Sequence, residues 1–239
     1  MSTTTTTRPA TGHLMSLAGQ AHVAEGPLDL NGMYMAHHAF RRDLVRFAAA
    51  ARQTPVEDVE VWQALAVRWE QFGSILHHHH TTEDDVLWPQ LLDLADAEGR
   101  ATLEAMEAEH EVIDPMLAAC AAGFAAMAQS ADEATRARLA ATTETARDTL
   151  SDHMAHEERE ALPLVQELLS EEGWQRVEKA AGSGKGLKDL MFLAPWIADG
   201  LTPEQLDTVV AMIGTPFRWM LAITRGRYAR GETIAFRYA

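Results

Sequence analysis

The chain has 239 residues, of which 47% are hydrophobic, enough for one domain with a sizeable core and an extension. Its 20 basic and 35 acidic residues give a formal net charge of −15, which argues against a nucleic-acid-binding surface, because phosphate neutralisation requires an excess of Lys and Arg. The aromatic content of 7% favours helices over strands, and the single Cys120 excludes an intramolecular disulfide framework and a Cys-rich zinc site.

The N-terminal segment 1–26 is rich in Thr and is expected to form a flexible tail. It has no apolar run of the length that a signal-peptide core requires. No later stretch approaches the roughly 20 uninterrupted apolar residues of a membrane-spanning helix. These features predict a cytoplasmic protein without a membrane partner.

Helix-start signals divide the next part of the chain. Asn31 can cap a first helix, and Thr54–Glu57 has the sequence of a capping box with Pro at the first helical position. A weaker start lies near Gly99, and Ser130–Glu133 has the sequence of a second capping box. Gly173 is expected to end the fourth helix. The predicted helices are 31–52, 55–97, 99–128 and 131–171.

The connections between these helices are short, which favours antiparallel neighbours. We therefore expect an all-α protein in which residues 27–172 form an up-down-up-down four-helix bundle. Pro89 and Pro163 lie inside the second and fourth helices and predict a kink or a break there, because proline lacks the amide hydrogen that a helix needs.

Residues 173–239 predict a helical extension. A flexible break at 182–186 is followed by a capping box at 202–205, and Thr215-Pro216 can begin a further helix. Residues 214–239 contain five Arg and one Glu, on a chain that is otherwise strongly acidic. The opposite charges predict that the extension packs on the bundle or on a partner subunit, in the second case as a homodimer.

Each of the four helices carries an inward stripe at spacings of three and four residues. The stripe is apolar except at one level, where His, or His together with Glu, replaces Leu. The residues at this level are His37, His79, Glu83, His110, His153 and Glu157.

Burying two carboxylates and four imidazoles without partners would cost several kcal/mol per charged group. A bound cation removes that cost. Six such groups exceed what one four-coordinate ion needs, and they suit a two-metal site bridged by carboxylates. Mixed imidazole and carboxylate ligation in a helical bundle favours iron over zinc.

The pattern occurs twice along the chain. The sequence His-x3-Glu stands at 79–83 and at 153–157, and in both places a Pro follows ten residues after the His. A single His precedes each motif, at a distance of 42 residues in the first half and 43 in the second. The repetition predicts a pseudo-twofold bundle whose halves contribute equally to a dinuclear centre.

Residues 31–170 resemble a hemerythrin-like HHE cation-binding domain. The resemblance implies a non-haem di-iron centre in a four-helix bundle, carboxylate-bridged and with an oxo or hydroxo bridge, whose ligands would be the six residues named above. The motifs that carry it are His37-His38-Ala-Phe-Arg-Arg, His79-Thr-Thr-Glu83-Asp-Asp-Val-Leu-Trp-Pro, Glu-His110-Glu and His153-Met-Ala-His-Glu157-Glu-Arg-Glu-Ala-Leu-Pro.

Two positions depart from the oxygen-carrying members of that family. Those proteins have a second His one turn after the ligand of the third helix, where this chain has Asp114. They also have an Asp five residues after the His of the fourth helix, where this chain has Glu158. The departures argue against simple reversible oxygen carriage and imply a less filled coordination sphere.

Several neighbours remain alternatives or supporting groups. His37 is preferred to His38, which shares its helix face with Arg41. His80 follows Leu76 by four residues and is a candidate to support the ligands from behind. Asp114 and Glu158 are candidates for an extra ligand or a supporting acceptor. The remaining histidines of these motifs, His77, His78 and His156, are expected to be solvated.

The leading functional hypothesis is a di-iron protein that binds or reacts with oxygen, peroxide or nitric oxide, which leaves an oxidoreductase activity open. One alternative is a non-catalytic iron-binding or iron- and oxygen-sensing protein with the C-terminal extension as its output surface. Another is a structural bundle that binds zinc or manganese.

Overall fold

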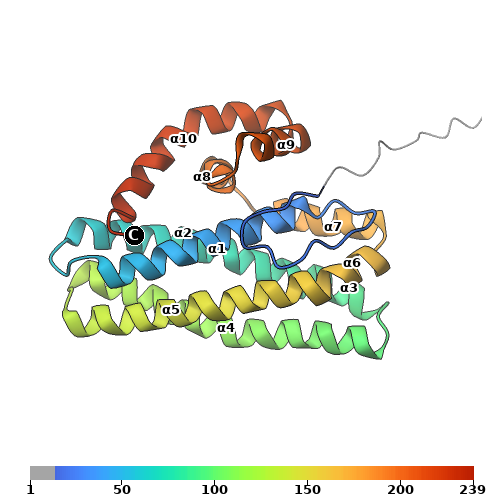
Figure 1. Ribbon diagram of the computed structural model, residues 1–239, viewed down its shortest axis with the longest axis horizontal. Coiled ribbons are helices and arrows are strands. Elements are labelled where there is room, and N and C mark those ends of the chain that lie inside the picture. The colour runs from blue at the N-terminus through green and yellow to red at the C-terminus, as the bar shows by residue number, and fades with distance from the viewer. Residues whose placement is uncertain (1–13) are drawn as a thin grey trace, which may run out of the picture.

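A computed structural model describes residues 14–239, in which helices are joined by short loops and no strand occurs. The predicted all-α class is confirmed. Four long helices lie side by side (Figure 1): α1 (Asn31–Gln53), α2 (Val59–Thr82), α4 (Ala97–Gln129) and α5 (Glu133–His156). Helix α2 packs against α4, and α5 packs against both α1 and α4.

The two predicted proline breaks take the form of π-helical turns. Turn η1 (Glu83–Leu87) leads into α3 (Trp88–Leu92), and turn η2 (Glu157–Ala161) leads into α6 (Leu162–Leu168). The Trp88 amide donates to the Glu83 carbonyl, and the Leu162 amide donates to the Glu157 carbonyl. Since proline offers no amide hydrogen and collides with the carbonyl four residues earlier, the ladder widens by one residue before it. Both π turns therefore begin at a carboxylate of the predicted metal site.

Helix boundaries differ from the prediction because aspartates and a serine, at positions other than the predicted start signals, begin four of the helices. Asp58 accepts from the Val61 amide at 3.3 Å, and Asp132 accepts from the Thr135 amide at 2.9 Å. Thr54 and Ser130 instead end the preceding helices, where their amides donate to carbonyls four residues earlier. Likewise α4 begins at Ala97 behind Asp96, and Gly173 lies in the first turn of α7 behind Ser170 instead of ending a helix.

Asn31 is the first residue of α1 and not its cap. Its side-chain oxygen accepts from the Met15 amide at 2.7 Å, while Asp29 accepts from the Asn31 amide at 3.0 Å. The predicted tail 1–26 is therefore packed where it is described, with Met15, Leu17 and Ala24 buried. Residues 1–13 of that prediction lie outside the described residues.

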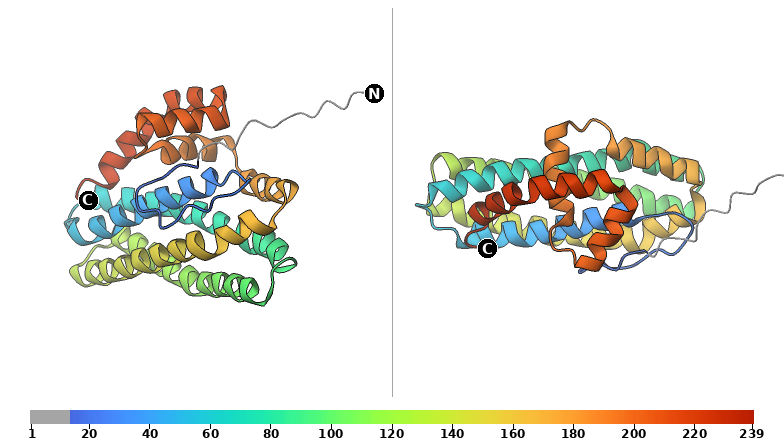
Figure 2. Two further views of the ribbon diagram at one scale, coloured as in Figure 1. Left: turned by 45° about the vertical axis from the view of Figure 1, so that its right-hand side comes forward. Right: turned by 90° about the horizontal axis from the view of Figure 1, so that it is seen from above.

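The C-terminal extension consists of α7 (Glu171–Gly182), α8 (Leu187–Ala198), α9 (Pro203–Ile213) and α10 (Thr215–Ala235). The capping box at Thr202–Gln205 and a helix beginning at Thr215 are confirmed. Helix α8 packs against α1, and α10 packs against α2 and α8. Figure 2, seen from above, shows α10 running along the long helices with α8 crossing beneath it.

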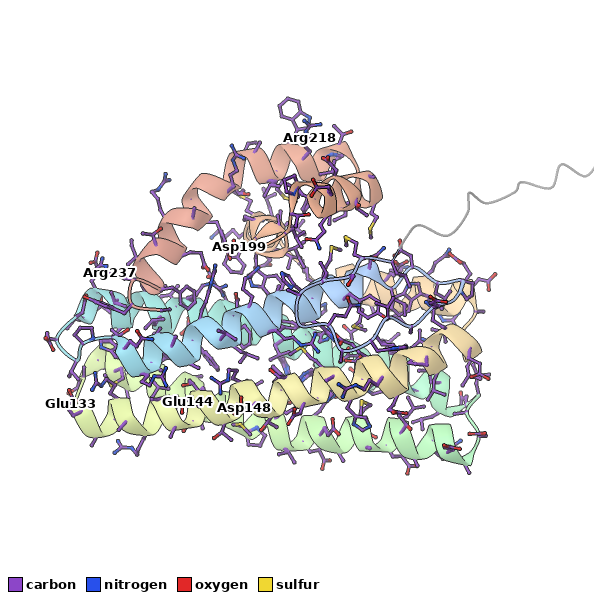
Figure 3. All side chains as sticks on the ribbon, viewed as in Figure 1. Glu133, Glu144, Asp148, Asp199, Arg218 and Arg237 are labelled. Carbon is purple, nitrogen blue, oxygen red and sulfur yellow. The ribbon has the colours of Figure 1, made fainter. Side chains whose placement is uncertain are left out.

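A buried ion-pair network joins the extension to the long helices. Asp43 of α1 is fully buried, pairs with the Arg68 guanidinium, and accepts from Trp196 Nε1 of α8 at 2.7 Å. Arg68 of α2 also donates from Nε to Glu232 Oε1 of α10 at 2.6 Å. Asp199, which follows α8, pairs with Arg46 of α1 at 2.9 Å and is labelled at this junction in Figure 3. Charged pairs therefore hold the extension, but here its acidic groups face Arg46 and Arg68 of the long helices, which is the reverse of the predicted charges. The predicted sense occurs where Arg237 pairs with Asp58 and Glu60.

Apolar side chains fill the space between the long helices in two clusters. One contains Phe47, Trp69 and Phe124, and the other contains Trp88 and Met106. Each cluster takes residues from one side of the His and Glu level. The polar level is therefore enclosed between two hydrophobic layers.

Helix α4 is the one described helix that is long and apolar enough, by length and composition alone, to cross a membrane, a test that core helices of soluble proteins also pass. Its buried stripe, which includes Leu103, Cys120 and Phe124, faces the neighbouring helices of the chain.

Candidate metal centre

The structure brings seven side chains together in two adjacent groups. Within each group, one potential ligand atom from every residue lies within 4.8 Å of the others. The first group, from α1, α2, η1 and η2, is His37, His79, Glu83 and Glu157. The second, from α2, α4 and α5, is His80, His110 and His153.

The first group holds buried polar atoms without hydrogen-bond partners. His37 Nε2 lies 3.0 Å from Glu157 Oε2, and His79 Nε2 lies 3.1 Å from Glu83 Oε1. Yet His37 Nε2 and all four oxygens of the two glutamates make no hydrogen bond. Buried polar atoms are nearly always satisfied in native proteins, so five such atoms at one point fit a site that can hold a cation.

The second group brings two imidazole nitrogens face to face. His110 Nε2 and His153 Nε2 face each other at 3.1 Å. Their Nδ1 atoms lie 2.8 Å from Asp84 Oδ1 and from Glu109 Oε2, respectively. An imidazole whose single proton is donated from Nδ1 to a carboxylate presents a lone pair at Nε2. In that tautomer a metal ion could accept both Nε2 atoms, whereas a hydrogen bond between them needs a proton on one Nε2.

His80 completes the second group, and Glu83 connects the two groups. The His80 ring stacks on the His110 ring with centroids 4.0 Å apart. Glu83 Oε2 lies 3.7 Å from His110 Nε2, while Oε1 faces His79 in the first group. One carboxylate thus reaches both groups, as a bridging ligand does.

The pKa shifts of His37, Glu157 and Glu83 show how the buried charges of the first group balance one another. Burial alone would lower the pKa of His37, but the charge of Glu157 raises it to about 9. Burial would raise the pKa of Glu157, and the charge of His37 lowers it to about 2. Burial and the charge of Glu157 raise the pKa of Glu83. Two carboxylates this close cannot both be charged without a positive partner.

His79 and His80 are held neutral, the form that binds metal. Burial lowers the pKa of His79 to about 3 and lowers the pKa of His80 further below its ordinary value. The charges of neighbouring histidines act in the same direction.

Outer carboxylates fix the orientation of the ligand rings. Glu158 is fully buried and lies 2.9 Å from His37 Nδ1. It also accepts from Arg41 at 2.7 Å and from the Ala21 amide at 2.6 Å. Asp114 Oδ1 lies 3.3 Å from His80 Nδ1 and remains half exposed. Such contacts set the tautomer and increase the basicity of metal-binding histidines.

The six residues predicted as ligands all lie in these two groups, but the halves of the chain do not contribute as equals. Glu157 of the second half joins the residues of the first half, whereas the three-imidazole group takes His80 from the first half. His38 lies outside both groups, and its Nδ1 faces the Ala18 carbonyl at 3.2 Å.

His80 was predicted to support the ligands from behind, but the structure places it within the second group. The signal was present, since His80 follows the buried Leu76 by one helical turn. Asp114, which stands where the oxygen carriers have their additional His, contacts His80 instead. Of the histidines predicted to be solvated, His77 is exposed, while His78 and His156 are half-buried and contact the Ala181 carbonyl and Glu109.

Comparison with known proteins agrees with this geometry. Residues 29–165 match the family model of the hemerythrin HHE cation binding domain. This chain belongs to that family. The match spans more than half of the chain and every residue of both groups, and it ends before the extension α7–α10. Neither the curated proteins nor the solved structures contain a match to the chain.

Proposed function

We propose that this hemerythrin-family protein binds two iron ions and uses them to bind or react with a small oxidant, such as oxygen, peroxide or nitric oxide. The proposal rests chiefly on the five buried ligand atoms of the first group that have no hydrogen-bond partner. The two Nε2 atoms that meet in the second group support it. His37, His79 and Glu157 would hold one ion, and His80, His110 and His153 the other, with Glu83 between them.

The protein's own contribution is orientation and enclosure. Glu158, Asp84 and Glu109 keep protons on the outer nitrogens of His37, His110 and His153, which leaves the inner nitrogens free to bind metal. When bound, iron supplies redox chemistry and positions for small exogenous ligands. The apolar layers on both sides limit the access of water to the ions.

Metal analysis tests the proposal directly. Protein reconstituted with iron should contain about two ions per chain, as a site with more than four ligands requires. Glu83→Ala and His80→Ala should each lose iron, whereas His77→Ala, in the same histidine run but exposed, should keep it. A content of one ion in excess iron, or equal losses in the His77 variant, would contradict the dinuclear site.

Azide and nitric oxide test the reactive part of the proposal. Either ligand should change the visible spectrum of the iron-loaded protein, and peroxide should be consumed faster than by free iron. A spectrum that ignores all three small molecules would exclude oxidant chemistry and favour a purely iron-binding role.

A second candidate function is iron or oxygen sensing through the extension. It is supported by a series of ring contacts that connects a metal-ligand candidate to α8. The Phe40 ring lies 5.2 Å from the His79 ring and 5.3 Å from the Trp196 ring of α8. Iron binding would then alter the position of α8. Iron should change the tryptophan emission of the wild type, and Trp196→Phe should abolish that change. Wild-type emission that does not respond to iron would exclude this sensing contact.

Four further proposals concern the domain organisation, the location and the oligomeric state of the protein. We propose that residues 27–172 form an up-down-up-down bundle and that 173–239 is a separate helical extension. We also propose a cytoplasmic location and a homodimer that forms through the extension.

A further inference from the structure

A cavity of about 580 Å³ lies between the long helices and the C-terminal extension. Helices α1, α2 and α7 form one part of its wall, and α8, the end of α9 and α10 form the other. Figures 1 and 2 show α8 placed between α10 and the long helices. Its volume falls within the roughly 300–1,000 Å³ of small-molecule sites in proteins.

The wall of this cavity is almost wholly apolar. Its larger side chains include Met33, Phe40, Trp174, Trp196 and Phe217. Four of these five are aromatic, and such rings present flat, rigid surfaces to a hydrocarbon ligand. The extension supplies more than half of the wall, and the extension lies outside the region matched by the family model.

The cavity reaches the candidate metal centre. His79 and Glu83 line it, and both belong to the first group of ligands. His79 is the one member of that group that is not fully buried, with 16% of its side chain exposed. An occupant of the cavity would therefore lie against a metal ligand.

We propose that the cavity binds a neutral, largely hydrocarbon organic molecule and holds it beside the metal centre. An apolar wall stabilises such a ligand by removing its surface from water, at roughly 25 cal/mol per Å². A charged ligand would be disfavoured over most of this wall, whose charged residues are Glu83, Glu178 and Lys185. The position next to a metal rests on the proposed function, whereas binding in the cavity does not.

The probe N-phenyl-1-naphthylamine tests binding, because its emission rises on transfer from water to an apolar site. We expect saturable binding of one probe per full-length chain, with or without iron. Gly32 of α1 lines the cavity, and a Cβ atom added there would meet no neighbour within 4 Å. Gly32→Leu and Ala36→Phe should each weaken binding at least about tenfold by occupying the space.

Gly73→Leu is the matched control. Gly73 lies in α2, away from the cavity wall, and its added Cβ would also meet no neighbour within 4 Å. It should bind the probe like wild type, and circular dichroism should show all three variants folded. Absence of saturable binding, or equal weakening in Gly73→Leu, would overturn the proposal. So would loss of probe binding as the protein concentration rises, which would show a second copy in the cavity.

Iron-loaded protein separates this inference from the proposed function. The probe should shift the visible absorption of the iron-loaded wild type but not that of Gly32→Leu. Probe binding by a protein that takes up no iron would overturn the proposed function and leave the cavity site standing. Iron uptake without probe binding would overturn the cavity site alone. Probe binding that leaves the iron spectrum unchanged would refute the placement beside the metal.

Discussion

Replacing Asp43 by Ala should destabilise the protein strongly, because this carboxylate is the centre of the buried network between α1, α2 and α8. The Asp43 side chain has no exposed surface, and the Arg68 side chain is 5% exposed. Burial lowers the pKa of Arg68, but the charges of Asp43 and Glu232 raise it above its ordinary value. Because a guanidinium is not deprotonated in proteins, Arg68 stays charged when Asp43 is removed.

The size of the effect follows from what Asp43→Ala leaves behind. Arg68 keeps only Glu232 as a charged partner, and Trp196 Nε1 loses its acceptor. Breaking a buried ion pair by removing one partner costs about 3–5 kcal/mol. At roughly 2–4 °C per kcal/mol for a domain of this size, the melting temperature should fall by about 6–20 °C.

Thermal unfolding followed by far-ultraviolet circular dichroism measures this change. Arg52→Ala is the matched control in the same helix, because its pair with Glu144 (labelled in Figure 3) is exposed. An exposed pair contributes at most about 1 kcal/mol. If Asp43→Ala melts within 2 °C of Arg52→Ala, the buried network does not hold the extension in place, and our reasoning is refuted.

Three further predictions concern the metal centre and the extension. In metal-free protein, the pKa of His37 is raised from 6.5 to about 9, so the stabilisation from its charge should be complete below pH 6.5 and lost as the pH rises to 9. The pKa of Glu157 is lowered from 4.5 to about 2, so the stabilisation from its charge should be complete above pH 4.5 and lost as the pH falls to 2. Neutral His79 and His80, whose pKa values are lowered, lose stability as the pH falls below 6.5, and Glu83, whose pKa is raised, adds to the loss at high pH. Urea unfolding should therefore show a maximum near pH 6.5, at lower stability than iron-loaded protein, and a flat profile would contradict the reasoning. Glu158→Ala should weaken iron affinity by roughly 10–100-fold in a chelator competition, while the exposed Glu133→Ala should not change it. Gly214→Ala should cost about 1–3 kcal/mol in urea unfolding, since Gly214 has a φ of 97°, whereas Gly231→Ala inside α10 should be neutral or stabilising.

Three features could be predicted from the amino-acid sequence alone: the all-α class, the position of the site along each helix, and six of the seven side chains that form the two groups. Periodicity carries this information, because residues spaced by three and four must share a helix face, whatever that face contacts. His37, His79 and His110 are examples: each stands in an apolar stripe, and each is buried or nearly so. The proline breaks were also predictable, since the missing amide hydrogen is a property of the residue itself.

The helix starts were less predictable, because neighbouring polar residues compete to cap the same helix. Thr54 could cap a helix that began at residue 55, but it ends α1, and Asp58 caps the helix that begins at Val59. A capping motif is therefore a local preference that the connecting loop can override.

The membership of the two groups and the cavity beside them depend on how the helices pack, which the sequence pattern does not specify. A stripe defines a face of one helix but not its rotation against three others, and the π turn at Glu83 alters that rotation next to His79 and His80. His80 therefore enters the three-imidazole group, and Glu157 joins His37 across the chain. The cavity beside His79 is likewise invisible in the sequence, because it exists between elements more than 100 residues apart whose relative placement is set by packing and by the buried Asp43 network.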